Sequence, residues 1–172
     1  MHVSQSDAHD FFVLGLKNAH ATTRQGRVLV ETQVRRLEHY PTVKARLESH
    51  LAEKDRQLKR LETLLEHYGE SPSVLKDTAM ATAAAAAGIA SAAAADEVVK
   101  NSFATLAQAK YEAAAYETLL VLGEAAGETA ALRPIQQSLS ESRGLATFIE
   151  ENLRGTAVRF LQLRAQGQQA KR

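Results

Sequence analysis

The chain has 172 residues, which is enough for one domain with a hydrophobic core. Its 21 basic and 20 acidic residues nearly cancel, and a net charge of +1 indicates neither a nucleic acid nor a membrane surface as a partner. The chain has no cysteine, which excludes disulfides, thiolate catalysis and zinc ribbons.

The sequence shows no membrane-spanning or secretory signal. No apolar run approaches the roughly 20 residues that a spanning helix needs. The uncharged stretch 79–95 is mostly alanine and is too weakly apolar to insert. The first ten residues, MHVSQSDAHD, lack the basic and apolar regions of a signal peptide. We therefore expect a cytoplasmic protein.

Apolar and small residues recur every three or four positions in the first part of the chain, which is typical of amphipathic helices. This spacing predicts a first helix over residues 6–38. The link HYPT turns the chain, and Pro41 suits the opening of a second helix over residues 42–68. The inward stripe of the second helix is apolar except at His50 and Lys54. The two helices should form a hairpin with arms of similar length.

The next segment, 73–93, is rich in alanine, the residue with the highest helix propensity. We interpret it as a helical crossover packed on the bundle, and the alternative is a partly frayed, low-complexity linker. A third helix is predicted over residues 96–123, because two acidic residues at its start suit a helix N-terminus. The linker GEAAGET then leads to a fourth helix over residues 129–153.

The C-terminal residues differ in pattern from the four helices. Gly155 should interrupt the fourth helix, and residues 156–165 could form a short final helix. The end of the chain, 166–172, should be disordered. We therefore divide the chain into a bundle over residues 1–153 and a C-terminal helix or tail over residues 154–172.

This tail is basic. No acidic residue follows Glu151, and the pattern favours a solvated tail over a segment that binds an acidic partner. The basic residues after it are Arg154, Arg159, Arg164, Lys171 and Arg172.

Two helical hairpins joined by a long crossover have the connectivity of ferritin-like bundles. The sequence therefore predicts an all-α, ferritin-like four-helix bundle of two antiparallel hairpins joined by an Ala-rich helical crossover. In a bundle that carries iron or manganese, the inward positions at mid-helix are carboxylates and histidines. Here the predicted inward positions are Thr23, Lys54, Ala109 with Lys110, and Ser142.

Segments over nearly the whole chain resemble the YciF-like ferritin-like family, a bacterial family of poorly defined function. The resemblance implies a four-helix bundle with a carboxylate-rich centre able to hold a dinuclear metal, a homodimer, and an association with stress responses. Most of the matching segments encode turns and packing, so they say little about chemistry. They include KNAHATTRQ at 17–25, RRLEHYP at 35–41, RLESHLAEKDRQLKRLE at 46–62, HYGESPSVLKDTA at 67–79, DEVVKNSFA at 96–104, YEAAAYETL at 111–119 and RFLQLRAQGQQAKR at the end.

Carried over residue by residue, the metal site that this resemblance implies is depleted. Where the family has glutamates on the first and third helices, this chain has Thr23 and Ala109. On the fourth helix the family pattern L-x-E-E-E corresponds to LSESR at 139–143, so Ser142 replaces a further glutamate. Lys54 stands where a small polar residue is usual. The candidate metal ligands that remain, as a vestigial set, are His50, Glu53, Glu112 and Glu141.

A dinuclear iron or manganese site needs about four to six carboxylate or imidazole ligands. An inward ammonium at Lys54 or Lys110 would repel a dication, and it could instead neutralise the remaining glutamates. We therefore expect no catalytic residue and no resident cofactor. The leading hypothesis is a structural or interaction protein, related to stress by resemblance only.

Three points of function stay open at this level. The main alternative is an iron- or manganese-binding bundle with weak oxidase or peroxide-handling activity. We expect a homodimer and an unidentified protein partner, without nucleic acid or membrane. A partner could bind the outer face of the first hairpin or the Ala-rich crossover.

Overall fold

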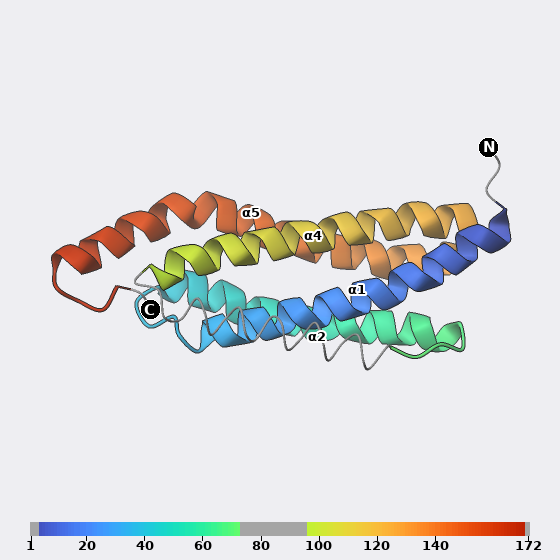
Figure 1. Cartoon of the computed structure of the whole chain (residues 1–172), viewed down its shortest axis with the longest axis horizontal. Helices are drawn as coiled ribbons and strands as arrows, with labels where there is room; N and C mark the ends of the chain where they lie inside the picture. Colours follow the sequence, from blue (N-terminus) through green and yellow to red (C-terminus); the bar gives the residue numbers. More distant parts are fainter. Residues whose placement is uncertain (1–3, 73–95, 171–172) are drawn as a thin grey trace.

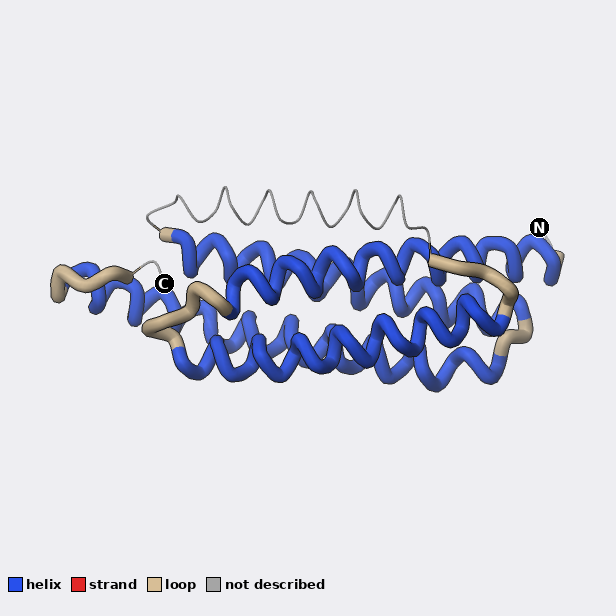
Figure 2. Tube along the Cα trace, turned by 90° about the horizontal axis from the view of Figure 1, so that it is seen from below, coloured by secondary structure: helices blue, strands red, loops and turns tan. Residues whose placement is uncertain are grey.

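The computed structural model describes residues 4–72 and 96–170, which form four long α-helices. The helices run side by side as an elongated bundle of two antiparallel hairpins (Figure 1, Figure 2). This arrangement confirms the predicted all-α four-helix bundle, whereas the predicted crossover over 73–93 lies outside the described residues. The helices are α1 (Gln5–Val34), α2 (Pro41–His67), α4 (Glu97–Ala126) and α5 (Thr129–Ala165).

Each helix packs against two neighbours. α1 contacts α2 and α4, and α5 contacts α4 and α2. α1 therefore lies diagonally across the bundle from α5, and α2 lies diagonally across from α4. A side chain of α2 that reaches α4 must consequently pass through the centre of the core.

Local sequence signals determine the helix ends. The Oγ of Ser4 caps α1 by accepting a hydrogen bond from the Asp7 N–H at 3.1 Å. Pro41 occupies the first turn of α2, where an N–H would have no partner within the helix. α4 ends at Gly127, whose φ of 79° lies in the left-handed region that favours glycine.

The core consists of two apolar clusters with polar residues between them. One cluster includes Phe12 and Leu119, and the other includes Val30 and Leu47. Burial of these side chains is the main favourable contribution to folding. The buried polar residues at mid-helix include Thr23, His50, Lys54, Glu112 and Ser142.

The inward positions predicted for α1, α2 and α5 are confirmed at mid-helix. Thr23 and Ser142 are fully buried, and Lys54 is only 1% exposed. The prediction for α2 missed Gln57, which is fully buried in place of its half-buried neighbour Leu58.

The inward face predicted for α4 is wrong by one residue. Ala109 is buried as predicted, but Lys110 points outward and binds Glu150 of α5 at 2.6 Å. Apolar residues occur on both the inner and the outer side of α4, so its hydrophobic pattern does not define the rotation of the helix sharply. Even so, none of the helices in residues 4–72 and 96–170 is long and apolar enough to span a membrane.

The interruption predicted at Gly155 is wrong, because α5 continues as one helix to Ala165. Glycine in a helix interior costs only about 1 kcal/mol relative to alanine. Complete burial of Leu163 beyond the glycine favours the longer helix. The boundary predicted between residues 153 and 154 therefore falls inside α5, whose last turns extend past the bundle beside the α1–α2 turn (Figure 1).

The residues after α5 fold back onto the α1–α2 turn. The N–H of Gln168 donates to the carbonyl of Leu163 at 2.9 Å, which closes the helix end. The Tyr40 hydroxyl donates to the carbonyl of Ala170 at 2.6 Å, and Ala170 is buried. The disorder predicted for residues 166–172 is therefore wrong as far as Ala170, and the last two residues lie outside the described part.

Candidate functional site

The centre of the bundle holds an ion pair between Lys54 of α2 and Glu112 of α4, whose side chains are 2% and 1% exposed. The pair crosses the bundle along its diagonal. Lys54 Nζ also donates to Gln57 Oε1 at 3.1 Å. The carboxylate of Glu112 accepts from Gln108 Nε2 at 3.0 Å and from Ser142 Oγ at 3.3 Å. Both charges are therefore paired and hydrogen-bonded, which a buried ion pair requires.

Gly26 of α1 provides the space that Glu112 occupies. A Cβ at position 26 would collide with Oε1 of Glu112 and would lie 3.1 Å from Nε2 of Gln108. The remaining space between Gly26, His50 and Lys54 has no room for a water molecule. The ion pair is thus enclosed by protein atoms on the α1 side.

His50 lies beside this pair and is fully buried. Its Nδ1 is hydrogen-bonded to Glu53 Oε2, which also accepts from both terminal nitrogens of Arg46 at 3.2 and 3.3 Å. Burial lowers the pKa of His50 below its usual 6.5, although Glu53 acts in the opposite direction. A neutral His50 therefore donates from Nδ1, and its buried Nε2 has no hydrogen-bond partner among the described residues.

A third ion pair joins α2 to α5. Arg60 donates to both oxygens of Glu141 at 2.8 Å, in the forked geometry that suits guanidinium and carboxylate, and to Ser138 Oγ at 3.1 Å. Gln57 Nε2 donates to Glu141 Oε2 at 3.1 Å. Burial acts to raise the pKa of Glu141, but the hydrogen bonds from Arg60 and Gln57 outweigh it and hold that pKa below 4.5.

On the side of the core toward the first apolar cluster, Thr23 Oγ1 and the Tyr116 hydroxyl are hydrogen-bonded at 2.7 Å. Tyr116 is buried, and burial together with the negative charge of Glu112 raises the pKa of its hydroxyl. The phenol is therefore neutral. Thr23 thus holds a packing tyrosine where the resemblance would place a glutamate.

The four predicted ligands do not converge on one point. His50 and Glu53 form one pair, while Glu112 and Glu141 bind cations of α2. In the described part of the chain, no group of three or more histidine, aspartate or glutamate side chains is placed to hold a metal ion. This donor set does not fit a dinuclear metal centre, because each carboxylate already has a cationic partner.

Sequence reasoning missed the role of α2 as the source of positive charge. Arg46 and Arg60 lie seven residues to either side of Glu53, a spacing that places all three on one side of a helix. From that spacing, the sequence could have predicted that Arg46 and Arg60 form ion pairs on the same side of α2. The hydrogen bonds of Gln57 and Gln108 had no comparable signal, because they depend on how α4 and α5 are rotated.

The fold and the ion-paired core define the class of the protein as an all-α four-helix bundle with paired charges at its centre. Over residues 7–162 the chain matches the family described as "Domain of unknown function (DUF892)", and it belongs to that family.

Two solved structures share this fold. The chain is 24% identical to a protein from Xanthomonas campestris pv. campestris, with a TM-score of 0.78, over 92% of this chain and 99% of that one. It is also 24% identical to YcfI from Rhodopseudomonas palustris, a proposed structural protein, with a TM-score of 0.66, over 83% of this chain and 92% of that one. At this identity the likeness shows the fold alone, and the finer YciF-like resemblance stays a prediction.

The central ion pair can be tested by removing one charge. In Lys54→Met, Glu112 keeps a buried charge without a partner, so the free energy of unfolding should fall by about 3–5 kcal/mol. Adding Glu112→Gln removes that charge and should restore most of the loss. Urea unfolding at pH 7 measures both effects. The control is Lys59→Met on the exposed face of α2, and a Lys54→Met loss no larger than the control's would contradict the assignment.

Stability should also depend on pH through His50. Because its pKa is lower in the folded protein than the unfolded value of 6.5, its contribution is complete above that value and is lost as the pH falls below it. Glu53 and Glu141, whose pKa values lie below 4.5, add a second loss below that pH. Urea unfolding at several pH values should show both steps in the wild type and only the second in His50→Gln. Identical profiles would refute the role of His50.

Proposed function

We propose that this protein is a ferritin-like structural or interaction protein, without catalysis, whose core carries ion pairs in place of a dinuclear metal site. The buried pair of Lys54 and Glu112 carries this proposal. An ammonium with two acceptors gives the glutamate the positive counter-charge that a metal ion would otherwise provide. A stress-related setting is part of the proposal and rests on the family resemblance.

The charge balance of the core supports this reading. Arg46, Lys54 and Arg60 of α2 face three glutamates, so the ion pairs are neutral as a set. A divalent cation would have to displace the buried ammonium of Lys54 or the partly buried guanidinium groups and leave them without partners, which is unfavourable. The description of YcfI as a proposed structural protein agrees with this function.

The test is metal content by elemental mass spectrometry. Tag-free protein is measured as purified, and again after anaerobic loading with ferrous iron and desalting. We expect far less than one metal ion per chain in both samples, with the same result for Glu112→Gln. About two ions per chain, absent from Glu112→Gln, would instead establish the iron- or manganese-binding alternative with its oxidase or peroxide chemistry.

The outer face of α4 supports the homodimer. Seven exposed positions, spaced by three or four residues, form an uncharged stripe along the helix, which we name the α4 seam. Three of its large apolar side chains are unusually exposed: Phe103 at 54%, Tyr111 at 63% and Val121 at 62%. A continuous apolar surface of this kind is typical of an interaction site. The α4 seam consists of Phe103, Ala107, Tyr111, Ala114, Thr118, Val121 and Ala125.

A second copy of this chain fits the α4 seam in an antiparallel arrangement. With a two-fold axis at Ala114, Phe103 would face Ala125 and Ala107 would face Val121, so large residues would oppose small ones. The exposed charges of α4 are complementary in the same arrangement. Its first half carries Lys100 and Lys110, and its second half carries Glu117 and Glu124.

The proposed dimer can be tested at the axis itself. The chain has no cysteine, so Ala114→Cys introduces a single thiol that should meet its copy within the roughly 7 Å limit for a disulfide. Mild oxidation should give a covalent dimer, whereas Ala52→Cys on the exposed face of α2 should not.

Sedimentation equilibrium completes the test. The wild type should sediment at tens of micromolar with about twice the 18.7 kDa of the chain. Ala114→Glu should reduce it to a monomer, because two carboxylates would then meet at the axis, while Ala52→Glu should remain dimeric. A wild-type monomer, or a dimer that Ala114→Glu leaves intact, would exclude the α4 seam as the interface.

A further inference from the structure

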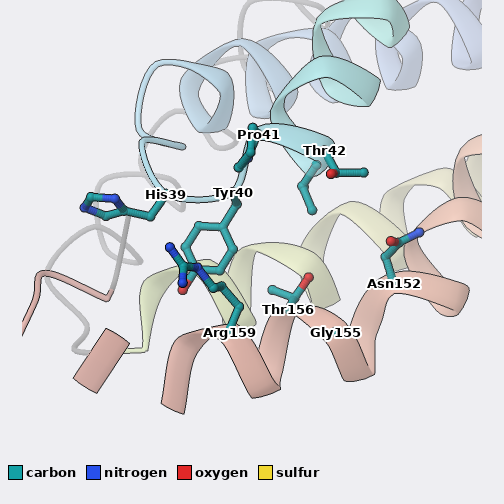
Figure 3. A pocket seen from close by; sticks show the side chains of 9 residues that line it. His39, Tyr40, Pro41, Thr42, Asn152, Gly155, Thr156 and Arg159 are labelled. Carbon is teal, nitrogen blue, oxygen red and sulfur yellow. The ribbon is translucent and has the colours of Figure 1, made fainter. Parts of the chain in front are cut away.

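The last part of α5, from Asn152 onward, and the α1–α2 turn form the two sides of an open cavity of about 290 Å³ (Figure 3). Tyr40 and Val43 form its apolar wall, and Thr156 and Arg159 of α5 form its polar wall. The volume is at the small end of the range for ligand pockets. None of the described residues that line the cavity is acidic.

Thr156 provides the first observation that points to a ligand. The residue is 6% exposed, yet its hydroxyl has no hydrogen bond among the described residues. Figure 3 shows the hydroxyl directed away from α5, toward the start of α2 and into the cavity. Other helical hydroxyls of this protein, such as that of Thr32, bond to a carbonyl one turn earlier. The hydroxyl is therefore available to bond to a ligand atom in the cavity.

Arg159 provides the second observation. It follows Thr156 by three residues, so both side chains lie on the same side of α5. No carboxylate of the described residues binds its guanidinium, whereas Arg36, Arg46 and Arg60 all form ion pairs.

The start of α2 gives the cavity a positive potential of the same sign as that of Arg159. The first turn of α2 forms the facing wall, and it contains no acidic residue and no side-chain cap. A helix start of this kind adds partial positive charge. The cavity thus combines a hydroxyl donor, a guanidinium and an apolar wall.

We propose that this cavity binds a small organic oxyanion, a phosphate monoester or a carboxylate. The oxyanion would accept hydrogen bonds from the Thr156 hydroxyl and from the forked guanidinium of Arg159. The organic part of the ligand would lie against Val43 and the ring of Tyr40. This site is separate from the ion-paired core and does not depend on the absence of a metal there.

The test is a titration at low ionic strength, by NMR or calorimetry, with phenyl phosphate, benzoate and inorganic phosphate. We expect saturable binding of phenyl phosphate or benzoate, and the tighter of the two identifies the anion class. Inorganic phosphate should bind more weakly, because it cannot use the apolar wall. Thr156→Val keeps the shape but removes the hydroxyl, so it should weaken binding about tenfold.

Matched variants distinguish binding at a defined site from non-specific attraction to positive charge. Arg159→Gln should weaken binding by at least about tenfold, whereas Arg154→Gln, the same change at an exposed position outside the cavity, should leave affinity within about twofold. Gly155→Leu places a side chain where nothing lies within 4 Å of a Cβ, so it should fill the cavity and abolish binding while the helix folds normally by circular dichroism.

Two results would overturn the proposal. One is the absence of saturable binding of every probe below about 10 mM. The other is equal weakening by Arg154→Gln and Arg159→Gln, which would show attraction to the basic end of α5 without a defined site.

Discussion

The buried charge of Glu112 is the constraint on which the centre of this bundle depends. A carboxylate that is 1% exposed must be neutralised and hydrogen-bonded, or it would destabilise the fold by several kcal/mol. Lys54 reaches it across the diagonal of the bundle, and Gln108 and Ser142 satisfy its remaining lone pairs. Position 26 is a glycine, and a larger residue there would collide with the carboxylate of Glu112. Residues on all four helices are thus arranged around one ion pair.

The negative charge of inward carboxylates can be neutralised in two ways, by a bound metal ion or by cationic side chains. Inward carboxylates repel one another, and a metal ion offsets that repulsion with concentrated positive charge. Here α2 distributes the positive charge over Arg46, Lys54 and Arg60, each fixed by its own hydrogen bonds. Such pairs are directional, so they favour one rotation of each helix, whereas apolar packing alone tolerates several. In this protein the ion pairs account for how the polar residues of the core are arranged.

The residues that sequence reasoning placed correctly share a physical property. α1, α2 and α5 each have a polar outer face that defines the inner one, so Thr23, Lys54 and Ser142 were placed without coordinates. Helix ends with caps, glycine or proline were also predictable. The continuation of α5 through Gly155 was not predictable. A glycine destabilises a helix too little to break it when later residues are buried. The pairing of Glu112 with Lys54 depended on the rotation of α4, which the sequence left ambiguous.

That ambiguity has a structural cause. A helix in a soluble bundle normally places charged residues on its outer face, and this pattern reveals which side is buried. In α4 part of the outer face instead carries Phe103, Tyr111 and Val121, so apolar residues occur on both sides of the helix. Apolar residues on two sides of a helix are expected where both of those sides are covered. The core covers one face of α4, and the proposed second copy of the chain would cover the other.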